Sequence, residues 1–274
     1  MVIRIITAII GAAAAFLIIS AGGWILTAAA MVIALLGLRE YTRMMEHIGK
    51  DVYVWPAAVM ILASILAASL HSLPLFLAAI LFCFIFILGM ILFIPQENVS
   101  FLFRTATGAV YLSLGMGSFV LLRDGETLLP SVTVSLDTGL FLMWFALLGT
   151  WASDSFAYLT GRCCGKHPMA PHISPHKTME GLAGGVAGTL VVCLLYSAYF
   201  GFPLGSGAVL GVLIAVAAPL GDLFESFLKR TCDVKDSGQL LPGHGGMLDR
   251  FDSLLFVAPV MVSFLIIVEK LEHL

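Results

Sequence analysis

Charged residues are scarce in this sequence. Asp, Glu, Lys and Arg make up 11% of the 274 residues, whereas soluble domains contain about 25%. Apolar residues make up 60%, and the mean hydropathy is +1.03. This balance excludes an ordinary soluble enzyme and predicts an integral membrane protein. Because no stretch is polar enough for a separate soluble domain, we expect residues 1–274 to form a single polytopic membrane domain.

An excess of basic residues is also absent. Fourteen Lys and Arg against 17 Asp and Glu give a net charge of -3, so nothing argues for a nucleic-acid partner. The five cysteines form an odd set without a CxxC spacing, which argues against a disulfide framework. Heptads, low-complexity tracts and obvious internal repeats are missing too. What remains is an all-α membrane bundle.

The apolar residues gather in about nine stretches, most of them near the ~20 residues that a membrane-spanning helix needs. Lipid tolerates only helices or closed barrels, and no alternating strand pattern appears, so we expect helices. The first stretch follows Arg4 and has some signal-peptide character, but its length favours a retained span. The expected spans are 5–21, 24–38, 53–69, 75–94, 102–122, 139–160, 181–200, 206–228 and 252–268.

Lysine and arginine residues predict the orientation. With nine spans, two of the 14 basic residues, Arg123 and Lys270, fall on one side of the membrane, which leaves twelve on the other. The side richer in Lys and Arg faces the cytoplasm. We therefore expect a multi-pass protein of the cell inner membrane, with its N-terminus and its polar loops in the cytoplasm.

The polar chemistry is densest around residues 226–252. Just upstream, Asp222, Glu225, Ser226 and Lys229 follow one another at i, i+3, i+4 and i+7, so they share one helix face. Two carboxylates, a hydroxyl and an ammonium on one face are incompatible with an apolar core. This face is our first candidate for a functional surface.

A glycine-rich loop lies downstream. Glycines surround His244, so the backbone there can approach a ligand closely, and Asp249 and Asp252 open the next helix. Carboxylates hold Mg²⁺, which usually bridges to substrate phosphates, so we interpret the stretch as a metal and nucleotide site. The alternative is a solvated charged loop. Its position between apolar spans, where ionisable groups are costly, favours the functional reading.

A second polar cluster follows the sixth span. Its two cysteines and three histidines suggest zinc, but Cys163 and Cys164 are adjacent and the histidine spacing fits no compact finger. We interpret residues 161–181 as a cationic, proline-stiffened phosphate loop in which Thr178 and Glu180 start the next helix. Glycines at steps of three and four in that helix predict close helix packing; they are Gly181, Gly184, Gly185 and Gly188.

Two blocks of residues carry a family resemblance. The first comprises Ser226-Phe227-Leu228-Lys229-Arg230, Lys235-Asp236, Leu241-Pro242-Gly243-His244-Gly245-Gly246 and Asp249-Arg250-Phe251-Asp252. The second comprises Asp154, Ala157-Tyr158, Gly161, Ile173-Ser174-Pro175, Lys177-Thr178 and Glu180-Gly181. Both resemble the phosphatidate cytidylyltransferases of bacterial type, also called CDP-diacylglycerol synthases. The resemblance is strong in the C-terminal half, so we expect 1–138 to be mainly scaffold and 139–274 to carry the catalytic loops.

The resemblance implies a nucleotidyltransferase of phospholipid biosynthesis that makes CDP-diacylglycerol and pyrophosphate from CTP and phosphatidate. It implies Mg²⁺ and room for a second cation such as K⁺, and a homodimer is plausible. The implied catalytic residues are Asp222, Asp249, Lys229, Arg230, His244 and Arg250. The implied substrate-binding residues are Ser174, His176, Lys177, Glu180, Ser226, Lys235, Asp236, Gly245 and Gly246. The first metal ligands are Asp222 and Asp249, with Asp154, Glu225, Asp236 and Asp252 as weaker candidates.

Several alternatives stay open at this point. His244 can contact phosphate or donate a proton, and the first is favoured because the attacking phosphate is already largely ionised near neutral pH. An enzyme with the same CTP chemistry could use an ether or polyprenyl lipid as its acceptor, and a CTP-dependent lipid kinase is a further alternative. An ion-coupled transporter would use Asp154, Asp222 and Asp249 as a cation path, but no inverted repeat supports it.

Overall fold

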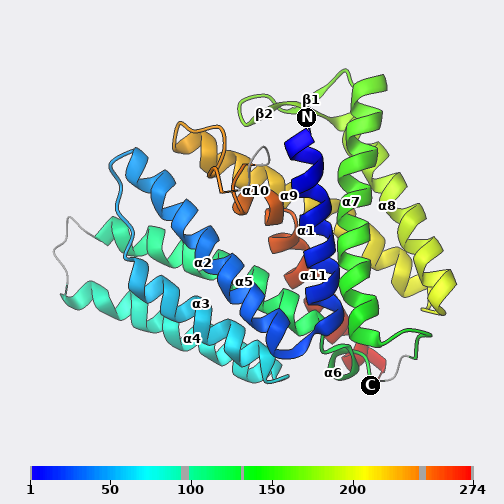
Figure 1. The fold of residues 1–274 in the computed structure, drawn as a ribbon, viewed down its shortest axis with the longest axis horizontal. Coiled ribbons are helices and arrows are strands. Elements are labelled where there is room, and N and C mark those ends of the chain that lie inside the picture. The colour runs from blue at the N-terminus through cyan, green and yellow to red at the C-terminus, as the bar shows by residue number, and fades with distance from the viewer. Residues whose placement is uncertain (1, 94–98, 131–132, 241–244, 273–274) are drawn as a thin grey trace. The chain divides into compact units, whose positions relative to one another are not determined.

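The computed structural model describes residues 2–93, 99–130, 133–240 and 245–272 (Figure 1). The chain forms two compact units. Unit 1 comprises Met1–Leu121 and Lys229–Phe251, and unit 2 comprises Leu122–Leu228 and Asp252–Leu274. The polar stretch 226–252 is therefore divided, with most of it in unit 1. That the chain acts as one membrane domain stays a prediction.

Unit 1 is built from helices that pack in sequence order, α2 on α3 and α3 on α4. Helix α5 approaches α2 and α4 closely through glycines: a Cβ on Gly108 would lie 2.6 Å from the Tyr41 ring, and one on Gly117 would lie 2.2 Å from the Phe76 ring. The Tyr41 hydroxyl also donates to the Arg104 carbonyl at 3.0 Å. The elements are α1 (Val2–Ala21), α2 (Gly23–His47), α3 (Val54–Ser69), α4 (Leu73–Gly89), η1 (Met90–Phe93), α5 (Val99–Leu122, its last residue beyond the unit) and α10 (Leu248–Phe251).

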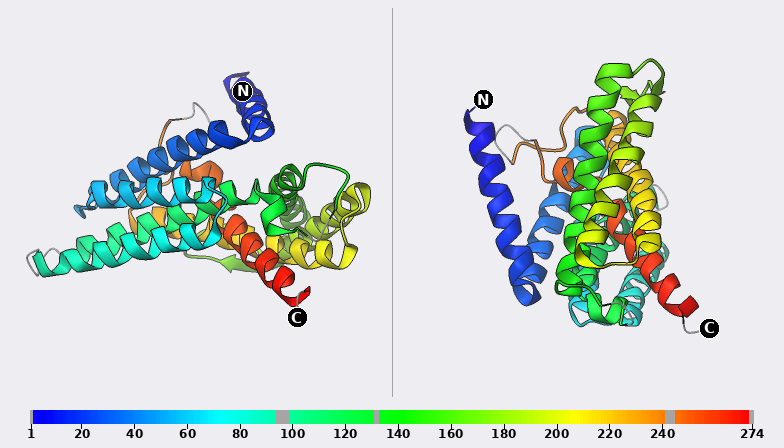
Figure 2. Two further views of the ribbon diagram at one scale, coloured as in Figure 1. Left: turned by 90° about the horizontal axis from the view of Figure 1, so that it is seen from below. Right: turned by 90° about the vertical axis from the view of Figure 1, so that its right-hand side faces the viewer.

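Unit 2 is organised around two long helices, α7 and α8, which run side by side (Figure 2). Asp137 caps the start of α7 by accepting from the Leu140 amide at 2.7 Å. Thr178 caps α8 by accepting from the Gly181 amide at 3.1 Å, as the sequence predicts for the start of this helix. The elements are α6 (Gly125–Leu128), α7 (Thr138–Cys164), β1 (Pro168–Ala170), β2 (Ser174–Thr178), α8 (Met179–Phe200), α9 (Leu204–Thr231, which ends in unit 1) and α11 (Leu254–Glu272).

A helix stands at each of the nine predicted spans, and in the described parts of the chain six helices are long and apolar enough to cross a membrane. These six are α2, α4 continued by η1, α5, α7, α8 and α9. In α4, which is almost wholly apolar, only Phe76 and Ile87 are buried, as expected of a helix that faces lipid. An all-α membrane protein is confirmed, whereas a count of nine crossings stays a prediction.

The loop after α7 differs from the expectation of helices alone. Strands β1 and β2 pair antiparallel, with Ala170 opposite Ser174, and form a hairpin between α7 and α8. Pro168, Pro171 and Pro175 lie in this segment and cannot continue a helix, whereas a short hairpin accommodates them. The segment is too short and polar to show the alternating pattern of a strand within a sheet.

Glycines on α8 let it touch α7 closely, which confirms the packing predicted for this stripe. A Cβ on Gly184 would lie 2.1 Å from the Thr160 hydroxyl oxygen, and one on Gly188 would lie 2.1 Å from Cγ of Phe156. Real Cβ atoms do not approach so closely, so α8 has no space for a side chain at either position. The two helices pack nearly backbone to backbone, as small residues permit in membranes.

We expect Gly188→Ala to lower the free energy of unfolding by about 1–3 kcal/mol, because the methyl group forces Phe156 or the helix to move. The measurement is thermal unfolding of the purified protein in detergent. Gly205→Ala, in the first turn of α9, is the matched control because nothing lies within 4 Å of the added Cβ. Equal stability of both variants would contradict the close packing.

Candidate functional site

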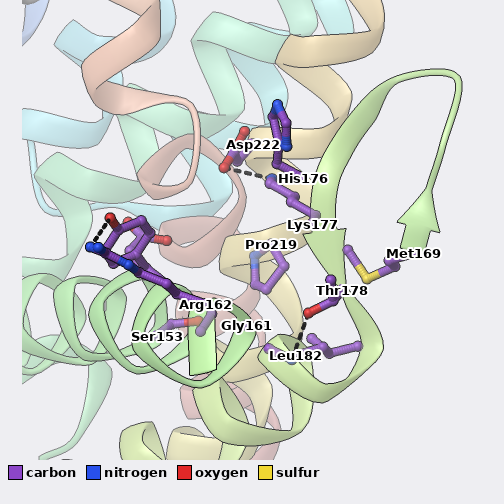
Figure 3. Close-up of a pocket in the computed structure, with 14 residues that line it drawn as sticks. Ser153, Gly161, Arg162, Met169, His176, Lys177, Thr178, Leu182, Pro219 and Asp222 are labelled. Carbon is purple, nitrogen blue, oxygen red and sulfur yellow. Dashed lines mark hydrogen bonds and ion pairs between the residues drawn. The ribbon is translucent and has the colours of Figure 1, made fainter. Parts of the chain in front are cut away.

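A cavity of about 590 Å³ opens in unit 2 between the C-terminal half of α7, strand β2, the first turn of α8 and the middle of α9 (Figure 3). Pro219 lies inside α9 and lines the wall three residues before Asp222. The lining residues are Ser153, Asp154, Ala157, Tyr158, Gly161, Arg162, Met169, His176, Lys177, Thr178, Gly181, Leu182, Pro219 and Asp222.

Two carboxylates and an ammonium group meet in this cavity. Nζ of Lys177 lies 2.6 Å from Oδ2 of Asp222, and the Ser226 hydroxyl donates to Oδ1 of Asp222 at 3.3 Å. Asp154 is close enough to interact electrostatically with both Asp222 and Lys177. The Asp222 side chain remains 34% exposed, so a ligand can reach it, whereas the exposed part of Lys177 is its stem and its Nζ is buried against Asp222. The arrangement can hold a cation through oxygen and a phosphate through nitrogen.

Two further side chains of the cavity, Tyr158 and Arg162, were absent from the predicted site residues. Arg162 follows Tyr158 by one turn of α7, and its Nη1 donates to the Tyr158 hydroxyl at 3.3 Å, so the phenol holds the guanidinium group. They follow Asp154 at i+4 and i+8, so helical spacing from that carboxylate was the signal that could have found them. Arg162 adds a second cation to the lining of the cavity, on α7, whereas Lys177 lies on β2 (Figure 3).

The predicted substrate-binding residues of the hairpin separate into two groups. His176 and Lys177 line the cavity, whereas Ser174 and Glu180 are not among its lining residues. Glu180 instead holds the loop that leads from α7 to β1. Its Oε2 accepts from the amides of Lys166 and His167 at 3.0 and 3.2 Å, and its Oε1 lies 2.5 Å from Nδ1 of His167. Glu180 thus ties the entrance of the hairpin to the start of α8.

Two weaker metal candidates also belong to unit 2. Glu225 is fully buried on α9, and Asp252 precedes α11 and accepts from the Ser253 amide at 2.7 Å. A Cβ on Gly221 would lie 2.4 Å from the Asp252 carbonyl oxygen. The backbone of Asp252 therefore lies directly against the turn of α9 that carries Asp222.

Asp249 is the centre of a polar network in unit 1. Its Oδ1 lies 2.6 Å from Nζ of Lys229, and its Oδ2 accepts from the amides of Ser237 and Gly246 at 3.0 and 2.8 Å. The side chains of Lys229 and Asp249 are only 13% and 7% exposed. Gly245 has a φ of +79°, and a Cβ there would lie 2.7 Å from Oδ2 of Asp249. The loop folds tightly around this carboxylate.

The remaining predicted residues of the 226–252 stretch lie at the surface of unit 1 or outside the described structure. Nη1 of Arg230 donates to the Val234 carbonyl at 3.3 Å. Lys235, Asp236 and Arg250 are exposed. His244 lies outside the described residues. Because Asp222 and Asp249 belong to different units, their joint role as metal ligands stays a prediction.

The chemistry of the donor set in the unit 2 cavity fits a hard divalent cation. Among the residues that the structure describes, no three His, Cys, Asp or Glu side chains gather closely enough to enclose a metal ion by themselves. Mg²⁺ does not require such a cage, since it usually keeps several waters and is held by one or two carboxylates together with substrate phosphates. Asp222 and Asp154 supply such carboxylates beside open volume.

The sequence is similar to known proteins along most of its length. The model of the cytidylyltransferase family matches residues 2–268. The phosphatidate cytidylyltransferase of Synechocystis is 36% identical over 287 aligned residues, which cover 96% of each chain. That of Bacillus subtilis is 40% identical over 159 residues, 57% of this chain and 55% of the other. That of Staphylococcus saprophyticus is 45% identical over 130 residues, 47% of this chain and 50% of the other.

Proposed function

This chain belongs to the cytidylyltransferase family, and from that premise we propose that it transfers the cytidylyl group of CTP to phosphatidate. The products are CDP-diacylglycerol and pyrophosphate, and the reaction belongs to phospholipid biosynthesis. The observation that carries the proposal is the similarity to a phosphatidate cytidylyltransferase over 96% of both chains. The cavity with Asp154, Lys177 and Asp222 supplies the matching chemistry.

The reaction needs positioning and charge stabilisation more than covalent catalysis. A phosphate oxygen of phosphatidate attacks the α-phosphorus of CTP, and the bond from that phosphorus to the oxygen bridging to the β-phosphate breaks. Pyrophosphate leaves with the electron pair of that bond, and no covalent enzyme intermediate forms. Transfers of this type depend mainly on alignment and on cations around the reacting phosphates.

The side chains divide by charge. Lys177 and Arg162 in the unit 2 cavity, with His176, would hold a phosphate group of one substrate, and Lys229, Arg230, Lys235 and Arg250 would neutralise the triphosphate and the departing pyrophosphate. Asp222 and Asp249 are the proposed metal ligands, with Asp154, Glu225, Asp236 and Asp252 as further candidates. A bound Mg²⁺ would neutralise phosphate charge, and a second cation such as K⁺ would add to this.

We place the protein in the bacterial inner membrane, with the N-terminus and the hairpin after α7 in the cytoplasm. This placement takes nine crossings, although only six helices in the described ranges are long and apolar enough by themselves, and with nine crossings the distribution of Lys and Arg gives this orientation. CTP is a cytoplasmic solute and phosphatidate is a lipid, so the two can meet only where a membrane cavity opens to that side. A homodimer is compatible with such a bundle.

The proposal is tested by measuring pyrophosphate release from the purified protein in liposomes, with CTP and Mg²⁺, with and without phosphatidate. Release that depends on phosphatidate, with CDP-diacylglycerol as the lipid product, supports it. Consumption of CTP only with an ether or polyprenyl lipid would move the activity to another acceptor. Absence of CTP turnover with every lipid would refute the enzymatic function.

The cysteines test the orientation. Cys163 and Cys164 at the end of α7 are exposed, whereas Cys232 is buried and burial raises the pKa of its thiol. A membrane-impermeant maleimide reacts with accessible thiolates, so we expect labelling at Cys163 and Cys164 in inside-out vesicles and none in intact spheroplasts. The Cys163→Ser/Cys164→Ser variant is the control. Labelling of this pair from the periplasmic side would overturn the proposed orientation.

A further inference from the structure

A single glutamate on α2 is buried beside the polar loop of unit 1. Glu40 is 6% exposed and shares its helix face with Gly37, Tyr41 and Met44, which are also buried. A buried carboxylate is costly unless hydrogen bonds compensate for the loss of water. The contacts of Glu40 therefore indicate what the side chain is for.

Both oxygens of Glu40 are used by residues about 200 positions further along the chain. Oε1 accepts from the Met247 amide at 2.8 Å, and Oε2 accepts from the Leu248 amide at 2.9 Å. The Ser237 hydroxyl lies 3.1 Å from Oε2. One side chain of α2 thus holds both ends of the segment between Ser237 and Leu248.

The same serine connects Glu40 to Asp249. Oγ of Ser237 lies 3.0 Å from Oδ2 of Asp249, and the Ser237 amide donates to the same oxygen at 3.0 Å. A hydroxyl has one proton, so it donates to one of the two carboxylates at a time. Lys229 on the opposite oxygen of Asp249 completes a chain of contacts that starts at Glu40.

Glycines of the loop are packed against Glu40. A Cβ on Gly238 would lie 2.6 Å from Oε1 of Glu40, and a Cβ on Gly246 would lie 2.6 Å from Oε2. A side chain at either position would therefore push the carboxylate of Glu40, and at Gly246 also Oγ of Ser237, out of the hydrogen bonds described above. The loop and Glu40 are shaped to fit each other, which a solvated charged loop would not require.

We propose that Glu40 is a positioning residue for cytidylyl transfer. Through Ser237 and the amides of Met247 and Leu248, it holds the loop in the conformation that orients Asp249 and Lys229. This inference rests on the proposed function, in which Asp249 and Lys229 act on the metal and the triphosphate. In this role Glu40 acts through other residues, and no contact between Glu40 and a substrate is needed.

The test compares Glu40→Gln with Glu46→Gln, since Glu46 is an exposed glutamate on the same helix. Glutamine offers one oxygen, and its NH₂ group cannot accept from a backbone amide. Outer partners of a metal site typically contribute 10–100-fold, so we expect kcat to fall by about that factor, with a higher Mg²⁺ requirement and an unchanged KM for phosphatidate. Glu46→Gln should match the wild-type protein.

Hydrogen–deuterium exchange provides a readout that does not depend on turnover. In Glu40→Gln we expect faster exchange at the amides of Met247 and Leu248 and unchanged exchange in α7 and α8. Unchanged exchange at those two amides would overturn the proposed anchoring. Glu40→Gln could also exchange faster throughout the protein while its folded fraction keeps the wild-type kcat. Glu40 would then stabilise the fold in general, and the proposal would be overturned.

The outcomes separate this inference from the proposed function. If the wild-type protein turns over CTP and Glu40→Gln does so equally well, the positioning role is wrong and the function stands. If the wild-type protein never turns over CTP, the function is wrong, and the catalytic role of Glu40 fails with it. The exchange measurement decides the anchoring in either case.

Discussion

Asp222→Asn is expected to reduce phosphatidate-dependent pyrophosphate release by at least ~100-fold in kcat/KM. The amide keeps the size of the side chain but removes the charge that pairs with Lys177 at 2.6 Å and that a divalent cation would need. Loss of electrostatic stabilisation in a preorganised site typically costs ~100–1,000-fold. The measurement is initial rate against CTP and Mg²⁺ concentration in liposomes.

Asp233→Asn is the matched control for this variant. Asp233 is an exposed carboxylate with a φ of +54°, a conformation that asparagine also adopts, so the substitution should leave both fold and activity unchanged. If Asp222→Asn keeps more than a third of the wild-type rate at low Mg²⁺, then Asp222 is not a ligand or a charge partner in the reaction. The unit 2 cavity would then lose its central residue.

Asp249→Ala should abolish activity and also destabilise the protein. The substitution removes the partner of Lys229, whose side chain is 13% exposed, together with the acceptor of the Ser237 and Gly246 amides. Breaking a buried ion pair by removing one partner typically costs about 3–5 kcal/mol, because the remaining buried charge loses that partner. We expect a lower melting temperature in detergent and a loss of at least ~100-fold in pyrophosphate release.

The double variant Asp249→Ala/Lys229→Met separates the two effects. It also removes the ammonium that had paired with Asp249, so part of the lost stability should return, whereas the activity should not. Recovery of activity along with stability would show that Asp249 supports the fold alone. If the second substitution recovers no stability, then the stability lost in Asp249→Ala comes from the missing acceptor of the Ser237 and Gly246 amides and not from the broken ion pair.

Local sequence patterns predicted the helices, and the family resemblance supplied several of the residues that line the unit 2 cavity. Apolar length gave the helix positions, Thr178 was expected to start α8, and the glycine stripe predicted the contact with α7. Asp154, Lys177 and Asp222 were all candidates, and the structure brings them into one cavity. The helices and the glycine stripe depend on local spacing and composition, which a sequence shows directly, whereas Asp154, Lys177 and Asp222 lie on three different elements and their roles were implied by the family resemblance.

The role of Glu40 was hidden because its partners are about 200 residues away. The first 138 residues were expected to be mainly scaffold, so no role was predicted for Glu40. One signal was available: Glu40 follows Gly37 by three and precedes Met44 by four on an otherwise apolar face. The resemblance implied that Glu180 binds substrate, which stays a prediction; the structure shows that its carboxylate holds the backbone at the entrance of the hairpin, a role that the sequence did not indicate.

The close packing of α7 and α8 also restricts how a lipid can arrive. No side chain separates the two helices at Gly184 or Gly188, so an acyl chain has no lateral gate between them along this seam. A phospholipid whose headgroup reaches Lys177 must slide in past a different wall of the cavity, with its tails left in the bilayer. Bulky substitutions at Gly184 or Gly188 should therefore lower stability without changing the preference of the protein for particular acyl chains.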